Sequence, residues 1–167
     1  MKKIYLAGGC FWGVEHFLSL IPGIKKTTVG YANSDIGSPS YEDLKAHRSS
    51  AAETVEVCYD ENKISLKEIL DLFYKIIDPT LLDRQGHDIG HQYRTGIYYE
   101  DPEDEPIIRK SLDDLSASYT LPILTELLPL QNFTVAEEYH QDYLIKNPQG
   151  YCHVDPKMFE LARNYKK

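Results

Sequence analysis

The sequence predicts an α+β fold, a two-layer α/β sandwich in which helices flank a ferredoxin-like mixed sheet. Segments with strand and helix patterns are interspersed along the 167 residues. The connections between them vary in length, without the regular alternation of a doubly wound parallel sheet. A chain of this length fits one domain with one core, and the turn-rich stretch 33–40 has too little proline and glycine for a linker. Residues 1–167 are therefore expected to form a single domain.

The first half of the chain predicts three strands and two helices. Residues 2–7 alternate as a strand, and Gly8-Gly9 turns the chain into a helix that begins near Cys10. The apolar stripe of this helix is Val14, Phe17, Leu18 and Ile21, and Pro22-Gly23 ends it. Strands at 27–31 and 53–59 flank a long loop. A helix over 65–77 opens with a capping box of Ser65 and Glu68.

The second half predicts two further strands and three helices. Residues 93–99 are strand-like, residues 121–130 contain a strand, and Asp101-Pro102 opens a helix to about residue 117. Thr134 and Glu137 have capping-box spacing ahead of a helix over 139–145. Asp155-Pro156 caps a last helix that turns Met158, Phe159 and Ala162 toward the core.

Charge and composition exclude several classes of protein. The net charge of −8 and the pI near 5.2 argue against nucleic-acid binding, which needs clustered Lys and Arg. The apolar run at the N-terminus is broken by Gly8-Gly9, too early for a signal peptide or a membrane span. Three widely spaced cysteines fit neither a disulfide framework nor a paired zinc motif. These features predict a cytoplasmic protein with reduced thiols and no contact with a membrane.

Cys10 is the candidate nucleophile. Because the predicted helix begins there, its sulfur faces unpaired backbone N–H groups and the positive end of the helix dipole, which favour the thiolate. Phe11 and Trp12 beside it offer an aromatic surface for an apolar group. The alternative from local sequence is that these three residues are the buried start of a core helix, because free cysteine is among the most buried residue types.

The segment Gly9-Cys10-Phe11-Trp12-Gly13 resembles the GCFWG signature of the A-type peptide methionine sulfoxide reductases. Matching segments follow in family order along nearly the whole chain: 30–32 (GYA), Tyr41, 52–53 (AE), 85–94 (QGHDIGHQYR), 136–144 (AEEYHQDYL) and 147–153 (NPQGYCH). The resemblance implies a monomeric enzyme that repairs proteins by reducing the S epimer of methionine sulfoxide, free or in proteins. It implies thioredoxin as the reductant, and neither a metal nor an organic cofactor.

Such a reaction needs an acid beside Cys10, because the sulfoxide oxygen must be protonated as the S–O bond weakens. Glu53 is the candidate, since in a strand it shares a face with Val55, Val57 and Tyr59, where an apolar setting would raise its pKa. The alternative is a glutamate at a strand end that points into water. The resemblance assigns Glu53 to the catalytic acid.

Three further residues receive roles from the resemblance. Tyr41 and Tyr93 are similar to the family tyrosines that hydrogen-bond the sulfoxide oxygen, a role suited to uncharged donors. Asp88 matches the family's acidic position, where it would orient a water or a side chain; stabilising a turn is an equal alternative. Phe11 and Trp12 are expected to hold the substrate's methyl group.

Cys152 resembles the family's resolving cysteine, which captures the sulfenic acid left on Cys10 as a disulfide. Cys58 lies on the opposite face of its strand from Glu53 and is expected to be structural or idle. Two departures from the family pattern leave these assignments unchanged. Ala51 stands where many members have histidine, and Lys45 stands where some carry a further cysteine.

Three other interpretations start from the same residues. A metal site of His87, Asp88, His91 and Cys10 would need a helix that Gly86 and Gly90 disfavour. A cysteine hydrolase would use His140 or His153 as base, but no spacing links either histidine to Cys10. A silent peptide-binding module would use the aromatic residues as an apolar pocket, but Cys10 and Glu53 are both retained.

Overall fold

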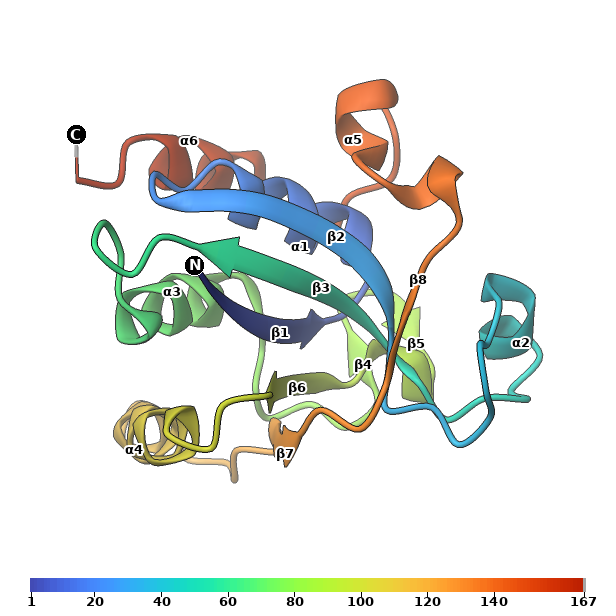
Figure 1. The fold of residues 1–167 in the computed structure, drawn as a ribbon, viewed down its shortest axis with the longest axis horizontal. Coiled ribbons are helices and arrows are strands. Elements are labelled where there is room, and N and C mark those ends of the chain that lie inside the picture. Colours follow the sequence, from blue (N-terminus) through green and yellow to red (C-terminus); the bar gives the residue numbers. More distant parts are fainter. Residues whose placement is uncertain (167) are drawn as a thin grey trace.

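The main sheet has six strands in the spatial order β7-β6-β1-β3-β2-β8 (Figure 1). Neighbouring strands are antiparallel, except that β6 and β7 are parallel. The strands are β1 (Lys2–Gly8), β2 (Ile24–Ala32), β3 (Ala52–Tyr59), β6 (Thr95–Tyr99), β7 (Glu126–Pro129) and β8 (Phe133–Val135). A separate ribbon pairs β4 (Arg84–Gln85) with β5 (Asp88–Ile89). This computed structural model describes residues 1–166 and confirms the predicted α+β fold with a mixed sheet and flanking helices.

The α-helices take different places around the sheet. They are α1 (Phe11–Ser19), α2 (Tyr41–Lys45), α3 (Leu66–Phe73), α4 (Asp104–Ser116), α5 (Tyr143–Lys146) and α6 (Pro156–Arg163). Short 3₁₀ turns lie at Tyr74–Ile76, His91–Tyr93 and Glu138–His140. In Figure 1, α3 and α4 lie at the left, whereas α2 and α5 lie at the right, the end toward which β1 points. The chain passes from β1 into α1 at this right-hand end, so residues 9–11 lie there.

The two faces of the sheet bury different sets of side chains. Ile4 and Leu6 of β1 belong to the main core, which also holds residues of α1, α3, α4 and α6. Tyr5 and Ala7 alternate to the other face and join a smaller cluster with Tyr98 of β6. This follows from the period of two in a strand, which sends successive side chains to opposite faces. The main core is therefore the layer between the sheet and its helices.

Several predicted elements are confirmed. The strand over 2–7 is β1, and the strand expected within 121–130 is β7. Ser65 accepts a hydrogen bond from the Glu68 N–H and the Glu68 side chain accepts one from the Ser65 N–H, which is the predicted capping box. The helix it opens ends at Phe73 and continues as a 3₁₀ turn. Asp155 caps α6 as predicted, by accepting a hydrogen bond from the Lys157 N–H.

Three predictions of local structure are wrong. The helix over 139–145 is a 3₁₀ turn followed by the short α5, because Thr134 pairs with Tyr31 as part of β8 instead of capping a helix. The strand expected over 93–99 begins at Thr95, and Tyr93 lies in a 3₁₀ turn. The long loop contains α2, whose capping box uses Ser40 with Asp43 rather than the more usual Glu or Gln.

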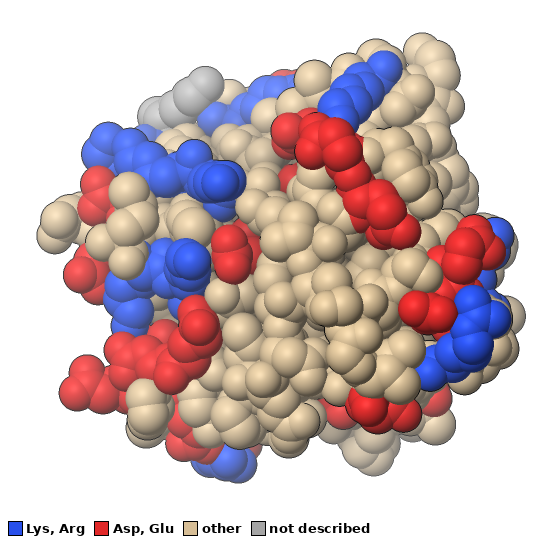
Figure 2. Space-filling model, turned by 45° about the vertical axis from the view of Figure 1, so that its right-hand side comes forward, with Lys and Arg blue, Asp and Glu red and all other residues tan. Residues whose placement is uncertain are grey.

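Charged side chains are interleaved on the surface. On the face shown in Figure 2, acidic and basic groups alternate on both sides of a broad uncharged centre. Ion pairs on the surface of the protein include Lys67 with Asp71 and Lys110 with Asp114. Within residues 1–166, no helix combines the length and the apolar character needed to cross a membrane.

We expect Leu70→Ala to lower the free energy of unfolding by about 2–5 kcal/mol, because Leu70 of α3 is fully buried in the main core. Leu82→Ala is the control, since that side chain is 70% exposed, and it should change stability by less than about 0.5 kcal/mol. Urea denaturation followed by circular dichroism measures both values. Equal effects of the two substitutions would contradict this description of the core.

Candidate active site

Cys10 lies at the junction between β1 and α1. It is the N-cap residue of α1, one position before the predicted first turn, and its exposed fraction is 7%. Gly9 before it has a φ of +90°, which a residue with a side chain rarely adopts. A Cβ on Gly9 would also lie 2.7 Å from the Cβ of Gln85. Glycine at this position therefore allows the tight turn that brings Cys10 to the start of the helix.

Glu53 of β3 lies beside this turn. Its Oε1 accepts a hydrogen bond from the Phe11 N–H at 3.3 Å, and within residues 1–166 its Oε2 has no hydrogen-bond partner. Burial raises the pKa of Glu53 to about 8, while the Phe11 N–H acts in the opposite direction. The carboxyl group is therefore protonated at neutral pH. The expected burial of Glu53 on the face of Val55 and Val57 is found.

The expected stabilisation of the Cys10 thiolate is not found. Burial raises the pKa of Cys10 well above its ordinary value, and the nearby Glu53 carboxyl adds to the increase. The Trp12 N–H at the start of the helix favours the thiolate but is outweighed. The position at a helix N-terminus does not lower the pKa of Cys10, because the loss of water destabilises the thiolate more than the N–H group stabilises it. Cys10 is therefore a thiol at neutral pH in the unliganded protein.

A pocket of about 180 Å³ opens beside Cys10. Its lining comprises seven of the residues singled out from the sequence, together with one other: Cys10, Phe11, Trp12, Tyr41, Glu53, Asp88, Tyr93 and Tyr151. Burial raises the pKa of Tyr41 to about 12 and raises that of Tyr93 as well, so both phenols keep their protons. The pocket thus includes the Cys10 thiol, the protonated Glu53 carboxyl group and the phenols of Tyr41 and Tyr93, all of which can donate hydrogen bonds to an uncharged acceptor.

Tyr41 and Asp88 are held by partners that the sequence did not place in the site. The Tyr41 N–H donates to Glu137 Oε2 at 3.1 Å, and Tyr31 donates to the other oxygen of that carboxylate at 2.7 Å. Tyr151 donates its hydroxyl proton to Asp88 Oδ2 at 2.9 Å. The Asp88 carboxylate therefore holds the Tyr151 side chain. Tyr151 precedes Cys152 in the matched motif, which was the one signal available for it.

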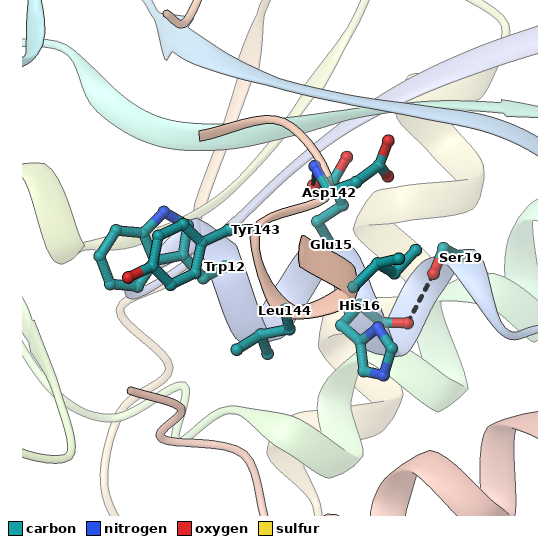
Figure 3. Close-up of a pocket in the computed structure, with 8 residues that line it drawn as sticks. Trp12, Glu15, His16, Ser19, Asp142, Tyr143 and Leu144 are labelled. Carbon is teal, nitrogen blue, oxygen red and sulfur yellow. Dashed lines mark hydrogen bonds between the residues drawn. The ribbon is translucent and has the colours of Figure 1, made fainter. Parts of the chain in front are cut away.

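Trp12 is fixed by side chains from residues 138–146. Its indole N–H donates to His140 Nδ1 at 3.0 Å. Its ring stacks on Tyr143, with centroids 3.7 Å apart and planes 7° apart (Figure 3). Glu15, one turn further along α1, accepts a hydrogen bond from the Asp142 N–H at 2.8 Å and so ties the same segment to the helix. From the sequence His140 was a candidate only as a hydrolytic base, whereas in the structure it accepts the hydrogen bond that orients Trp12.

Cys152 does not line the pocket of Cys10. Its sulfur lies 3.5 Å from the Val154 carbonyl oxygen and faces a groove of about 390 Å³ that includes His16 and Phe159. All three cysteines are free thiols within the described chain. Cys58 is half-buried on β3, on the face opposite Glu53 as predicted.

An α+β fold with a buried cysteine, a protonated carboxyl group and two phenols around one small pocket defines a thiol-dependent oxidoreductase. The family model described as peptide methionine sulfoxide reductase matches residues 2–167. The chain belongs to the peptide methionine sulfoxide reductase family, and it is an enzyme that reduces methionine sulfoxide. This excludes the cysteine hydrolase and the silent binding module. Concerning the metal interpretation, residues 1–166 contain no cluster of three or more His, Cys, Asp or Glu side chains that could hold a metal ion.

Individual relatives agree with this assignment. The peptide methionine sulfoxide reductase MsrA of Clostridium perfringens is 58% identical over 154 residues, which are 92% of this chain and 98% of that protein. The reduced form of Mxr1 from Saccharomyces cerevisiae is 40% identical with a TM-score of 0.86, over 90% of this chain and 88% of that one. Mxr1 in complex with Trx2 is 30% identical in the aligned region with a TM-score of 0.62, over 85% of this chain and 84% of that one.

Selective ¹³C labelling of glutamate carboxyl groups should reveal a resonance that titrates near pH 8 in the wild type and is missing in Glu53→Gln. The carboxyl is protonated below that pH and ionised above it, because burial raises its pKa. A second perturbed resonance, near pH 7, should vanish in Glu15→Gln, which makes that variant the control. A Glu53 resonance that titrates near the ordinary value of about 4.3 would contradict a protonated Glu53.

Proposed function

We propose that Cys10 reduces the S epimer of methionine sulfoxide by attacking its sulfur directly. The substrate's methyl group rests on Phe11 and Trp12, and its oxygen accepts hydrogen bonds from Tyr41 and Tyr93. The observation that carries this proposal is the pocket beside Cys10, where an apolar aromatic wall faces three uncharged proton donors. A sulfoxide has the matching shape, with a small apolar group and a strongly polar oxygen on one sulfur atom.

In the first step Glu53 donates its proton to the sulfoxide oxygen while the sulfur of Cys10 bonds to the substrate sulfur. The thiol proton of Cys10 restores the Glu53 carboxyl. The hydroxyl group then moves from the substrate sulfur to the sulfur of Cys10, the bond between the two sulfur atoms breaks, and methionine leaves with Cys10 as a sulfenic acid. The raised pKa of Glu53 supports this role, because an acid must hold its proton at the working pH.

In the second step Cys152 attacks the sulfur of the Cys10 sulfenic acid, which forms a disulfide and releases water. Thioredoxin then reduces this disulfide by exchange and restores both thiols. The complex of the related Mxr1 with Trx2 supports recycling by such a partner. Asp88 acts through Tyr151, whose ring forms part of the pocket wall.

The cellular setting and assembly of the protein belong to the same proposal. Residues 1–167 form one reductase domain, which acts as a monomer in the cytoplasm and repairs oxidised proteins. The continuous main core and the family match over residues 2–167 support a single domain. Sedimentation equilibrium of the purified protein tests the monomer directly.

Replacing the proposed acid should slow the chemistry strongly. We expect Glu53→Gln to lower the single-turnover rate of methionine formation by about 10²–10⁴-fold, the usual contribution of a positioned acid. The wild-type rate should fall as the pH rises through about 8, because Glu53 then loses its proton, and the variant should lack that decline. Glu56→Gln, on the opposite face of the same strand, should keep the wild-type rate and pH profile. Equal rates for Glu53→Gln and the wild type would refute the assignment of the acid.

The two cysteine roles are separable by intact-mass analysis and disulfide mapping after one turnover with methionine S-sulfoxide. The wild type and Cys58→Ser should release methionine and form a bond between Cys10 and Cys152. Cys152→Ser should release methionine and retain a sulfenic acid, whereas Cys10→Ser should release none. A bond between Cys10 and Cys58 would overturn the resolver, and undiminished turnover by Cys10→Ser would overturn the nucleophile.

A further inference from the structure

His153, the residue after Cys152, is hydrogen-bonded to the turn that carries Cys10. Its Nε2 lies 3.1 Å from the carbonyl oxygen of Gly8, two residues before Cys10. A carbonyl oxygen only accepts, so Nε2 carries the proton and Nδ1 is left with a lone pair. Nδ1 is buried and has no hydrogen-bond partner within residues 1–166. Burial also lowers the pKa of His153, which keeps the imidazole neutral.

Two glycines of the matched motif make room for this contact. A Cβ on Gly9 would lie 3.2 Å from His153 Nε2. A Cβ on Gly13 would lie 3.0 Å from the Cys152 sulfur and 3.6 Å from His153 Nδ1. The side chains of Cys152 and His153 therefore both lie against the bare backbone of the β1–α1 junction. A larger residue at either glycine would push the segment that carries Cys152 away from α1.

The contact matters because Cys152 has to move. In the reduced protein its sulfur lies near the Val154 carbonyl and faces the groove with His16 and Phe159, while Cys10 faces its own pocket. A disulfide requires Cα atoms about 4.4–6.8 Å apart. Neighbouring Cα atoms along the chain are about 3.8 Å apart. Because Cys152 is the neighbour of His153, a hydrogen bond that fixes His153 to the turn of Cys10 also limits how far the Cα of Cys152 can move from that turn.

We propose that His153 is a positioning residue for the resolving step: its hydrogen bond to Gly8 forms the pivot about which Cys152 swings onto the sulfenic acid of Cys10. This inference rests on the proposed role of Cys152 as resolver. The step it assists joins the two sulfur atoms, transfers the Cys152 proton to the departing hydroxyl group and releases water. His153 takes no part in the attack of Cys10 on the substrate, so the first step should not depend on it.

The test separates the two steps in the full-length protein. Reduced enzyme is mixed with excess methionine S-sulfoxide in the absence of reductant and quenched over time. Methionine reports the first step, and the Cys10–Cys152 disulfide, followed by thiol alkylation and mass analysis, reports the second. The variants are His153→Ala, which removes the pivot, and His153→Gln, whose side-chain amide can still donate to Gly8. His87→Ala is the control, because His87 is exposed, and thermal unfolding verifies that every variant folds.

We expect His153→Ala to form methionine within about twofold of the wild-type rate and the disulfide about tenfold more slowly, as for the loss of one hydrogen bond. His153→Gln should recover most of the lost rate, and His87→Ala should behave as the wild type. Disulfide formation at the wild-type rate in His153→Ala would overturn the pivot, as would equal slowing of both steps.

Two further outcomes are informative. Slow disulfide formation in His153→Gln as well as in His153→Ala would overturn the pivot in favour of a base acting through Nδ1, since an amide donates a hydrogen bond but cannot accept the Cys152 proton. If the wild type itself forms no Cys10–Cys152 disulfide while it releases methionine, the resolver assignment fails, and the role of His153 fails with it.

Discussion

The hydrogen bond from the Phe11 N–H to Glu53 is the contact on which the site depends. It joins the start of α1 to β3 and places the carboxyl group next to Cys10, the residue before Phe11. Glu53 is almost completely buried, and one N–H group does not compensate for the loss of water around a carboxylate, so the group keeps its proton. The same burial that secures the junction between helix and sheet therefore supplies the protonated carboxyl group that the proposed reaction uses.

Burial keeps both the proposed nucleophile and the proposed acid in their uncharged forms. Burial raises the pKa of Cys10 as well as that of Glu53, so the unliganded pocket holds a neutral thiol and a neutral carboxyl group rather than an ion pair. This neutral pair avoids the cost of a buried charge and suits an uncharged, strongly polar substrate. Tyr41 and Tyr93 extend this pattern, because their raised pKa values keep them as hydrogen-bond donors without adding charge.

Residues 137–146 hold the aromatic wall of the pocket in place, and this explains why they do not form the regular helix that their pattern suggests. His140 accepts a hydrogen bond from Trp12, and Tyr143 stacks on the Trp12 ring. The Asp142 N–H donates a hydrogen bond to Glu15 of α1. Asp142 itself adopts a left-handed backbone conformation with a φ of +51°. These long-range contacts draw the chain across the start of α1, and a continuous helix could not satisfy all of them at once.

The sequence by itself determined the mixed α+β class, the helix after Gly9 and seven of the eight residues around the pocket, because periodicity, glycine and capping positions are local and the matched motifs are specific. It did not determine the direction of the Cys10 pKa shift, which depends on burial by residues distant in the chain. Nor did it reveal Tyr151 on Asp88, His140 on Trp12 or His153 on Gly8. Each of those hydrogen bonds spans at least 63 positions in the sequence, so only the tertiary structure, by packing the C-terminal segment against the β1–α1 turn, decided them.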